Sequence, residues 1–340
     1  MSRQRDRIIL SHGSGGRLTG ELIAQTFLPP LHNPHLALLS DAAVLPELPP
    51  GRPALSTDAF VVDPSVFPGG DVGRLSICGT VNDVAMAGAR PMWLTWAVIL
   101  EEGVPMELVE TCVQSAAAAA EQAGVTVVAG DTKVVPKGSG DGVFAITAGM
   151  GVVPPGRDIG DHRITPGDLI LASGPLGDHG ATIMASRHDM LSETLQSDAA
   201  PVNHLVESLF EAGIDVHAMH DPTRGGLKSV TNEVAGRSET RQIIREASCP
   251  IRPEVKAVCE LLGLDPYGLA CEGRFLAWIG ADDAERAVEV LNSHPAGEQA
   301  AVIGRVEQAV AGHAPVVLET KTGSRKPLDL LSGTDLPRIC

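Results

Sequence analysis

The chain has 340 residues, of which 44% are hydrophobic and 3% aromatic, a length and composition that suit two domains of ordinary size. Acidic residues outnumber basic ones by 42 to 26, and the formal net charge of −16 argues against nucleic-acid partners and anionic membranes. No apolar run approaches the ~20 residues that span a bilayer, and the N-terminus lacks the apolar core of a signal peptide, so we expect a cytoplasmic protein.

Apolar runs and helix-like segments alternate through the first half of the chain. One helix is predicted over about 18–27, where a Pro-Pro pair ends it, and a second near 72–87. A third is predicted over 105–124, with proline at its start and glycine at its end. Short apolar runs predict strands at 36–45, 53–62, 93–100, 125–135 and 142–153.

A stretch rich in proline, glycine and charge, 153–168, is predicted to join the two domains. Strands and helices alternate on both sides of it without the regular period of a doubly wound fold, so we expect an α+β architecture. The elements predicted beyond it are strands at 169–174 and 269–280, a strand–loop–helix unit at 217–236, helices within 175–188, 204–213, 253–264 and 284–294, and a terminal strand.

Four aspartates of the first half follow apolar, strand-like runs in small-residue surroundings: Asp41, Asp58, Asp83 and Asp131. A single acid in such a position is usually a turn former or a helix cap. Four of them together with Lys133 resemble a hard-cation site, in which Mg²⁺ bridges carboxylates to phosphate oxygens and the lysine offsets phosphate charge. The residues alone leave both interpretations open.

Two glycine-rich segments differ in how specific they are. HGSGG (12–16) is typical of a flexible linker, whereas HDPTRGGL (220–227) brings Thr223 and Arg224 to a Gly-Gly step before a helix. Backbone N–H groups and a guanidinium can converge there on an anion, although a capping turn with a surface arginine has the same pattern. Neither GxxxxGK[ST] nor a strand-linked GxGxxG is present, so an ATP site must belong to another fold.

Two residues near the end of the chain are candidates for covalent and proton-transfer chemistry. Glu272, in ACEGR, is either a partly desolvated general base or a surface carboxylate paired with Arg274. Six cysteines show no zinc-like spacing, and most of them suit buried positions. Cys340 does not, because it is the last residue of PRIC and a chain end is rarely buried. Its thiol is therefore either incidental or the working group of the protein.

In chain order these segments resemble the HypE family of hydrogenase maturation proteins, part of the superfamily of aminoimidazole ribonucleotide synthetase and selenophosphate synthetase. The glycine loops and aspartates are shared across that superfamily and imply its fold and its use of ATP. The ending PRIC is specific to HypE. The matching segments are HGSGG, STDAFVVDPSVFPGGDVGRLSICGTVNDVAMAGA, EEG, GDTKVVPKG, GDHG, DPTRGGL, NEVA, GLDPYGLACEG and PRIC.

The resemblance implies a two-domain α+β fold like that of aminoimidazole ribonucleotide synthetase (PurM-like). An N-terminal ATP-binding and dimerisation domain would span 1–155, a C-terminal domain 156–332 and a mobile tail 333–340. ATP and Mg²⁺ would be the cofactors, and a homodimer the assembly. At ~3.3 Å per residue the tail reaches roughly 25 Å, enough for an outward and an inward position.

The resemblance also implies a reaction and its partners. The carbamoyltransferase HypF would load a carbamoyl group onto the terminal thiol. The chain would then dehydrate that S-carboxamide to an S-cyanide, while ATP is hydrolysed to ADP and phosphate. The HypC–HypD scaffold would receive the cyanide as a ligand for the iron of the [NiFe] hydrogenase centre.

Residue roles follow from the same resemblance. Cys340 would carry the substrate, Glu272 would act as the base, and Lys133 would stabilise the phosphoryl group. The four aspartates would bind metal. The chain departs from the family at Cys271, where asparagine is frequent, and this thiol could alter the surroundings of Glu272 or pair with Cys340 on oxidation. The implied nucleotide-binding residues are Gly15, Gly16, Asp58, Asn82, Thr132, Lys133, Thr223, Arg224, Gly225 and Gly226.

Two other functions remain compatible with the sequence. The chain could be another enzyme of the superfamily that phosphorylates or cyclises a small molecule, with an incidental tail. It could also be a non-enzymatic protein whose terminal thiol docks a partner or a metal. An ATP-dependent change in a carbamoyl adduct on Cys340 distinguishes the three.

Overall fold

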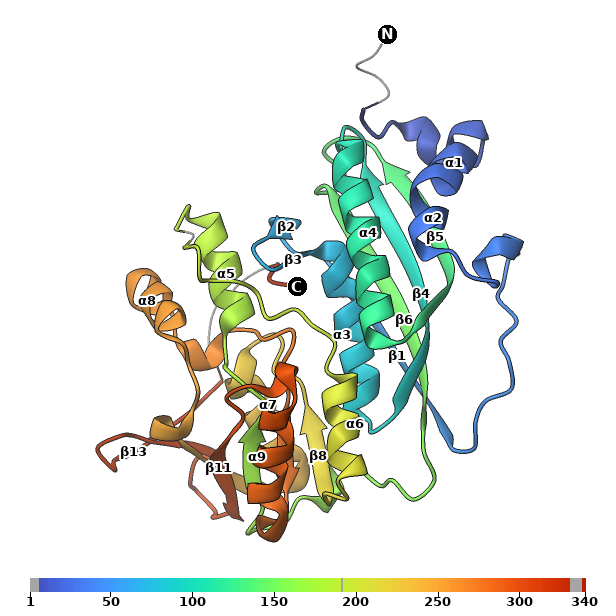
Figure 1. Ribbon diagram of the computed structural model, residues 1–340. Helices are drawn as coiled ribbons and strands as arrows, with labels where there is room; N and C mark the ends of the chain where they lie inside the picture. The colour runs from blue at the N-terminus through green and yellow to red at the C-terminus, as the bar shows by residue number, and fades with distance from the viewer. Residues whose placement is uncertain (1–5, 191, 331–337) are drawn as a thin grey trace.

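The structure, a computed structural model, describes residues 6–190, 192–330 and 338–340. It consists of two sheet-and-helix domains that lie side by side (Figure 1). Residues 333–337 of the predicted tail lie outside the described residues. Among the helices of the described part, none is long and apolar enough to cross a membrane.

The N-terminal domain is built on a four-stranded sheet with the order β1-β6-β4-β5. Only the β4–β5 pair is parallel within this sheet. Its strands are β1 (Arg52–Phe60), β4 (Arg90–Glu101), β5 (Thr126–Val135) and β6 (Val143–Val153), the small hairpin is β2 (Val66–Phe67) and β3 (Gly70–Asp71), and its helices are α1 (Arg17–Leu22), α2 (Leu28–Leu31), α3 (Val72–Met86) and α4 (Met106–Ala123).

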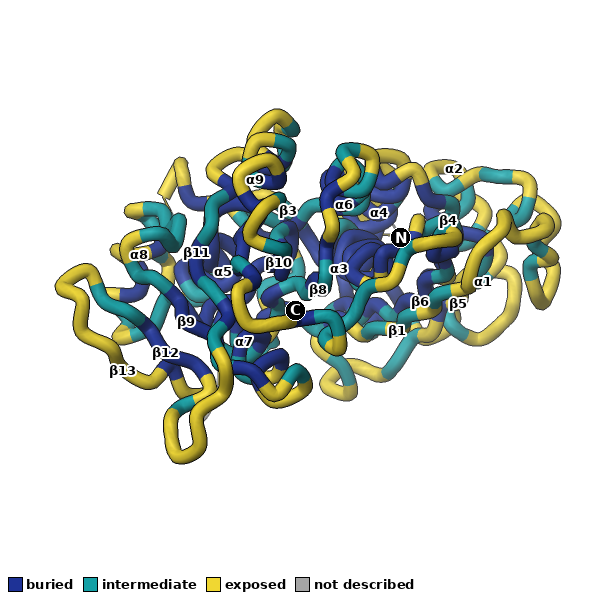
Figure 2. The backbone as a smooth tube through the Cα atoms, turned by 90° about the horizontal axis from the view of Figure 1, so that it is seen from below, coloured by how far each residue is buried: buried dark blue, intermediate teal, exposed yellow. Residues whose placement is uncertain are grey.

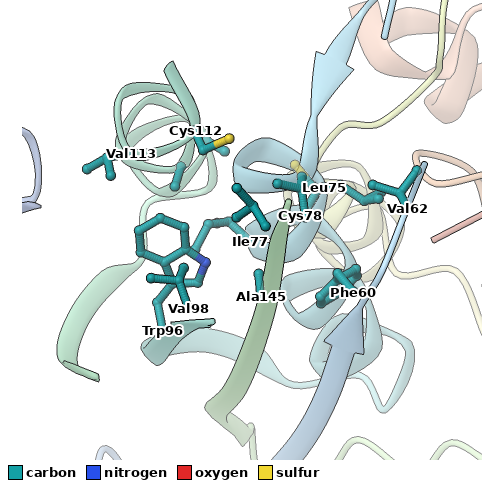
Figure 3. Close-up of a cluster of buried hydrophobic side chains, with 14 of the residues drawn as sticks. Phe60, Val62, Leu75, Ile77, Cys78, Trp96, Val98, Cys112, Val113 and Ala145 are labelled. Carbon is teal, nitrogen blue, oxygen red and sulfur yellow. The ribbon is translucent and has the colours of Figure 1, made fainter. Parts of the chain in front are cut away.

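Helices α3 and α4 cover one face of this sheet, and the side chains between them form the first core. Alternate residues point to opposite faces of a strand, so Trp96 and Val98 of β4 and Ala145 of β6 lie in the core beside Ile77 and Cys112 (Figure 3). The indole Nε1 of Trp96 donates to Ser76 Oγ at 2.9 Å, which satisfies its buried N–H group.

The opposite face of the same sheet is not covered by any described segment of the chain. Leu55 of β1 is 78% exposed there. Ile99 of β4 and Phe144, Ile146 and Met150 of β6 alternate with the buried residues of their strands and are only half-buried. An exposed apolar face of this kind is unusual for a free protein surface.

The C-terminal domain is built on a seven-stranded sheet with the order β13-β12-β9-β11-β7-β10-β8, in which only β12 and β9 are parallel. Separate hydrophobic clusters fill its two faces, one around Trp278 and Leu227 and one around Leu205 and Leu291. Its elements are β7 (Leu169–Ala172), β8 (Val216–His220), β9 (Thr240–Arg245), β10 (Leu276–Ile279), β11 (Ala301–Gln308), β12 (Val316–Glu319), β13 (Arg325–Pro327), α5 (Asp178–Arg187), α6 (Asn203–Glu211), α7 (Gly226–Ser238), α8 (Pro253–Leu262) and α9 (Ala284–Ser293).

Helix α3 is the central element of the molecule, and its start is fixed by a cap. The carboxylate of Asp71 accepts hydrogen bonds from the N–H groups of Gly73 (2.7 Å) and Arg74 (3.1 Å). Such an N-cap satisfies donors that the first turn leaves open. Gly73 then lets α4 approach, because a Cβ atom at this position would lie 1.9 Å from the carbonyl oxygen of Cys112.

This close approach predicts a large cost for one added methyl group. Gly73→Ala should lower the free energy of unfolding by about 1–3 kcal/mol, because α3 and α4 must separate. Urea unfolding at neutral pH measures it. Gly236→Ala in α7, where the space is open, is the control and should gain up to about 1 kcal/mol from helix propensity. Equal shifts in the two variants would contradict the packing argument.

Helix α3 also joins the two domains through Asn82, which is 1% exposed. Its amide Nδ2 donates to the carbonyl oxygens of Ala200 (3.1 Å) and Glu272 (3.2 Å), and its Oδ1 accepts from the N–H of Val202 at 2.8 Å. All three partners belong to the C-terminal domain. The side chain therefore fixes the main chain of Glu272 against the first domain.

A second contact between the domains is ionic. Glu207 of α6 accepts from Arg90 of β4 at 2.5 Å and from Arg157 of the linking segment at 2.6 Å. Burial alone would raise the pKa of Glu207, but the two guanidinium groups outweigh it and hold the pKa below its ordinary 4.5. A lowered carboxyl pKa means that this contact stabilises the fold above pH 4.5 and is lost as the pH falls through the lowered value.

Glu207→Gln should therefore lower the free energy of unfolding at pH 7 by about 1 kcal/mol after solvent screening. The difference from the parent protein should shrink as the pH falls below 4.5, where the parent carboxylate also becomes neutral. Chemical unfolding at pH 7 and pH 3.5 measures both, and Glu289→Gln, exposed on α9, is the control. A difference that is independent of pH would show that charge is not its source.

Several predicted elements differ from the observed ones. The run 36–45 is not a strand; it forms a short 3-10 turn (Leu36–Leu38) followed by a loop. The helix predicted over 18–27 begins at Arg17, passes through a π-helical segment (Ile23–Phe27) and continues in α2. The helix ends at Leu31, one residue after the Pro-Pro pair and close to the predicted end. Strand β9 was not predicted at all.

Candidate functional site

A cavity of about 210 Å³ lies between the two domains. The first domain contributes the end of β1 and one face of α3, and the second contributes the loop after β8 and the segment before β10. The C-terminal residue closes it. The lining residues are Thr57, Asp58, Phe60, Gly79, Asp83, Asp221, Thr223, Arg224, Glu272 and Cys340.

Close packing of β1 on α3 places two carboxylates at one end of the cavity. Asp58 lies on β1, and Asp83 lies on α3, where its Oδ2 accepts from Ser56 Oγ at 2.6 Å. Gly79, one turn before Asp83, permits the approach because a Cβ atom there would lie 2.9 Å from the ring of Phe60. The two acids thus come together from separate elements.

The turn before α7 brings Thr223 and Arg224 to the cavity. Gly225 and Gly226 have φ values of 76° and 57°, a region that side chains rarely adopt. A Cβ atom at Gly226 would also lie 2.4 Å from the carbonyl oxygen of Leu269. The Gly-Gly step is therefore required for the turn, and its two residues shape the cavity without lining it.

The end of the chain is seated in the same place. Figures 1 and 2 show the C-terminus between the domains, and Ile339 is 4% exposed within the first core. The N–H of Val61 donates to the carbonyl oxygen of Cys340 at 3.2 Å. The thiol of Cys340 is within hydrogen-bonding reach of the Glu272 carboxyl group.

The electrostatics of the cavity favour protonated acids. Burial raises the pKa of Glu272 well above its usual range, and the carboxylate of Asp221 adds to the shift. Burial, followed by the charge of Asp83, likewise raises the pKa of Asp221. Burial raises the pKa of Asp58 and of the Cys340 thiol as well. Several carboxyl groups that face one another in this way attract a cation.

A second pocket of about 230 Å³ lies in the N-terminal domain, beyond the other edge of the sheet. Its walls are mostly apolar and come from the π-helical segment, α2, Trp96 of β4 and β5. Asp41, Asp131 and Thr132 add polar groups to the lining. A mostly apolar lining with a few polar groups is typical of a small-molecule site.

The strand register separates the two sites. Asp58 pairs with Thr147, Thr147 with Trp96, and Trp96 with Gly130, so these residues form one row across the sheet. Three strand spacings place Asp131 about 14 Å from Asp58. One cation therefore cannot bridge them within a chain, and no three His, Cys, Asp or Glu residues of the described part form a metal-binding group on their own.

Both domains match known family models. Residues 39–153 match the N-terminal domain of AIR synthase related proteins, and residues 165–314 match the C-terminal domain of the same group. The carbamoyl dehydratase HypE of Rhodobacter capsulatus is 44% identical over the full length of both chains. The HypE of Azotobacter vinelandii is 47% identical over 97% of this chain and 96% of its own.

The chain belongs to the HypE family of carbamoyl dehydratases.

Solved structures agree with this assignment. A crystal structure of HypE in complex with ATP is 44% identical, with a TM-score of 0.93 over 98% of this chain and 99% of its own. HypE in a HypE–HypF complex is 41% identical, with a TM-score of 0.79 over 93% and 100%. The predicted PurM-like fold is confirmed. A thiamine-monophosphate kinase from Stenotrophomonas maltophilia, at 22% identity and a TM-score of 0.67, shares the fold alone.

Within this HypE-family fold, the predicted residues fall into three groups. Cys340, Glu272, Asp58, Asp83, Thr223 and Arg224 meet at the cavity between the domains. Asp41, Asp131 and Thr132 meet at the second pocket. Lys133 lies near the second group, 62% exposed, with its Nζ 2.5 Å from Asp131 Oδ2. The structure thus does not bring Lys133 to Cys340, nor the four aspartates to one point.

Five other predicted nucleotide contacts line neither pocket: Gly15, Gly16, Asn82, Gly225 and Gly226. Gly15 and Gly16 are exposed, and they follow a segment that packs against β5. The amide of Asn82 is buried and bonds to the main chain of the second domain, and its role in binding the nucleotide stays a prediction. The residue before Asp83 points away from the cavity because successive helical side chains lie on different faces.

Sequence reasoning missed Asp221 and assigned no role to His179. Asp221 begins DPTRGG directly after β8, so the signal was an acid at a strand end, the same signal that marked the four other aspartates. His179, in the GDHG segment, is fully buried at the start of α5. The partner of His179 is the end of the chain, and only the structure shows that the two meet.

The departure at Cys271 does not place a second thiol in the cavity. Cys271 is 1% exposed in the core of the C-terminal domain, and its Sγ accepts from the N–H of Gly177 at 3.1 Å. Cys340 instead packs against the core of the N-terminal domain. Both are free thiols with separate surroundings.

Proposed function

We propose that this chain dehydrates an S-carboxamide on Cys340 to an S-cyanide at the expense of ATP. One observation carries the proposal: the terminal thiol and the buried Glu272 carboxyl face each other in a cavity that also contains Arg224, Asp58 and Asp83. A carrier thiol, a base and a charged phosphate-binding region are the parts that this reaction requires. The relatives named carbamoyl dehydratase support the same reaction class.

The chemistry follows from the weakness of an amide oxygen as a leaving group. The carboxamide oxygen attacks the γ-phosphorus of ATP, the bond to ADP breaks, and the oxygen becomes a phosphate ester. Glu272, ionised once bound positive charge offsets the carboxylates around it, accepts an N–H proton as the C≡N bond forms and the phosphate leaves with the former amide oxygen. A second proton is released to solvent, and the sulfur retains the cyanide covalently. Positioned charge supplies most of the catalysis in phosphoryl transfer.

The residues present fit Mg-ATP. Carboxyl groups with raised pKa values around the cavity, and a Glu272 Oε1 atom without a partner among the described residues, indicate a site that lacks positive charge. Asp58 and Asp83 would hold Mg²⁺ on one side and Asp41 and Asp131 on the other, each pair completed by phosphate oxygens, since Mg²⁺ commonly binds one or two carboxylates plus phosphate. Mg²⁺ would supply charge for the transferring phosphoryl group.

The remaining nucleotide contacts divide between the two pockets. The apolar pocket at the edge of β5 suits the adenine ring, with Thr132 in its lining and Lys133 beside Asp131. Gly15 and Gly16 are proposed as further nucleotide contacts. Thr223 and Arg224 suit the γ-phosphate. This division supports the proposed ATP-binding and dimerisation domain at 1–155 and the proposed C-terminal domain at 156–332.

The distance between the two groups of acids favours a homodimer. The exposed apolar face of the first sheet, with Leu55 at 78% exposure, offers the contact surface, and a partner chain there would bring a second β5 edge near β1. We propose HypF as the source of the carbamoyl group, in line with the HypE–HypF complex of a relative, and a HypC–HypD scaffold as the cyanide acceptor. Cytoplasmic location stays a prediction.

Intact-protein mass tests the reaction. The chain is incubated with carbamoyl phosphate, ATP and the carbamoyltransferase, and the adduct is located by digestion. The expected result is a carbamoyl group on Cys340 that loses one water when ATP is present. Cys340→Ala should form no adduct there but retain ATP binding. An adduct unaffected by ATP would contradict the dehydratase, and no adduct on Cys340 would contradict the carrier role.

A further inference from the structure

The last residues of the chain are held through their backbone. The N–H of Asp63 donates to the carbonyl oxygen of Arg338, as that of Val61 does to Cys340, both at 3.2 Å. The two contacts run in opposite chain directions, so the end of the tail continues the first domain as a short antiparallel pair. Backbone pairing of this kind fixes how far the chain end reaches.

Helix α5 of the second domain binds the same segment from the other side. At its first turn, His179 Nε2 is 2.8 Å from the carbonyl oxygen of Ile339. At its last residue, Arg187 Nη2 donates to the carbonyl oxygen of Arg338 at 2.5 Å, while its Nε donates to that of Asp63 at 2.7 Å. Arg187 thus binds both strands of the pair.

The hydrogen-bond network determines which tautomer of His179 is present. Ser197 Oγ accepts the N–H of Ala199 at 3.1 Å and lies 2.8 Å from His179 Nδ1. The carbonyl oxygen of Ile339 can only accept, so His179 Nε2 must carry the ring proton that points at it. Burial lowers the pKa of His179 and so favours the neutral ring, in which Nδ1 is the acceptor and Ser197 Oγ donates to it. His179 is a neutral donor aimed at the tail.

Side chains of the tail add to this seat. Ile339 packs in the first core with Ile183 of α5. Arg338 adopts a φ of 57°, unusual for a residue with a side chain, and its guanidinium bonds to the carbonyl oxygen of Val61 (3.1 Å) and to Asp141. The unfavourable backbone geometry is compensated by contacts on both sides of the residue.

We propose that His179 and Arg187 are positioning residues for the ATP-dependent step, binding the tail backbone so that the Cys340 sulfur stands beside Glu272. Neither of them lines the cavity, and they act through the carbonyl groups of Ile339 and Arg338. Their part in catalysis rests on the proposed function, whereas the seating of the tail does not.

The accessibility of the Cys340 thiol tests how the tail is held, independently of the ATP-dependent reaction. His179→Phe keeps the ring that packs edge-on against Phe67 but removes the donor, and Arg187→Met removes both donors. Losing one hydrogen bond should speed alkylation of Cys340 by iodoacetamide roughly two- to tenfold, measured on the C-terminal peptide. His179→Gln, which retains an N–H donor, should restore much of the protection. His217→Phe, a largely buried histidine bonded to Asp168, controls for general loosening.

Turnover then separates positioning from structure. The rate of water loss from the carbamoylated tail should fall two- to tenfold in His179→Phe and Arg187→Met, while carbamoyl loading and the KM for ATP stay within twofold. Unchanged alkylation would show that His179 and Arg187 do not hold the tail in place, even if the dehydration proceeds. Faster alkylation with unchanged turnover would confirm that they hold the tail but contradict their positioning role in the reaction. Absence of dehydration in the parent protein would contradict the proposed function but not the binding of the tail by His179 and Arg187, because alkylation measures that binding separately.

Discussion

Glu272→Gln is expected to slow the ATP-dependent loss of water from the carbamoylated Cys340 by about 10²–10⁴-fold, the usual contribution of a positioned general base. Glutamine has the shape of glutamate but cannot accept a proton from the carboxamide. Loading of the carbamoyl group should be unaffected, because it requires the thiol and not the base. The KM for ATP should change little. Intact mass against time, after single loading, measures the step directly.

The same substitution should leave the fold at least as stable. Glu272 is 2% exposed, and its Oε1 atom has no partner among the described residues, so the native protein keeps an ill-satisfied carboxyl group at this position. A neutral amide there removes a buried ionisable group, and the melting temperature should not fall. Glu289→Gln, exposed on α9, is the matched control. Water loss within threefold of the parent rate would show that Glu272 is not the base.

The chemistry of the site could be predicted from the sequence, but its geometry could not. ACEGR and PRIC each indicated a reactive group, and both groups line the same cavity. Their meeting depends on the way β1, α3 and the second domain pack together, which no local pattern encodes. Asn82 shows the same limit, since its place in VNDVA looks polar and accessible, whereas tertiary packing buries it against the second domain.

The aspartates illustrate a second limit. Each was identified by its position after an apolar run, and this pattern correctly predicted a strand at Asp58 and at Asp131. The pattern does not predict strand order, and β1 and β5 are opposite edges of one sheet. Residues that look equivalent in the sequence therefore lie about 14 Å apart, three strand spacings.

The wrong strand at 36–45 has a physical reason of its own. An apolar run forms a strand only where a neighbouring strand and a packing face are available. In the described chain this run has neither, and Leu38, Leu39 and Val44 are 72%, 69% and 88% exposed. Such exposure of large apolar side chains is unusual for a free surface. It fits a segment that meets a second chain or a bound nucleotide.

Arg224→Gln is expected to reduce the rate of water loss by about 10²–10³-fold, the cost of removing one preorganised group that stabilises developing charge. Among the described residues that line the cavity, Arg224 is the basic one, and it faces Asp58, Asp83 and the Cys340 sulfur. Phosphoryl transfer to the carboxamide spreads negative charge over oxygens that must lie in this cavity, so the loss should appear in kcat.

Arg224→Lys separates charge from shape. A lysine keeps the positive charge but not the planar pair of donors, so it should recover part of the rate and leave a deficit of about tenfold. Arg286→Gln, exposed on α9, is the matched control. The rate of Cys340 alkylation should change little in Arg224→Gln, because the tail backbone is held by His179 and Arg187. If kcat is preserved and only the KM for ATP rises, Arg224 binds the nucleotide equally in the ground and transition states, and the charge that drives phosphoryl transfer must come from elsewhere.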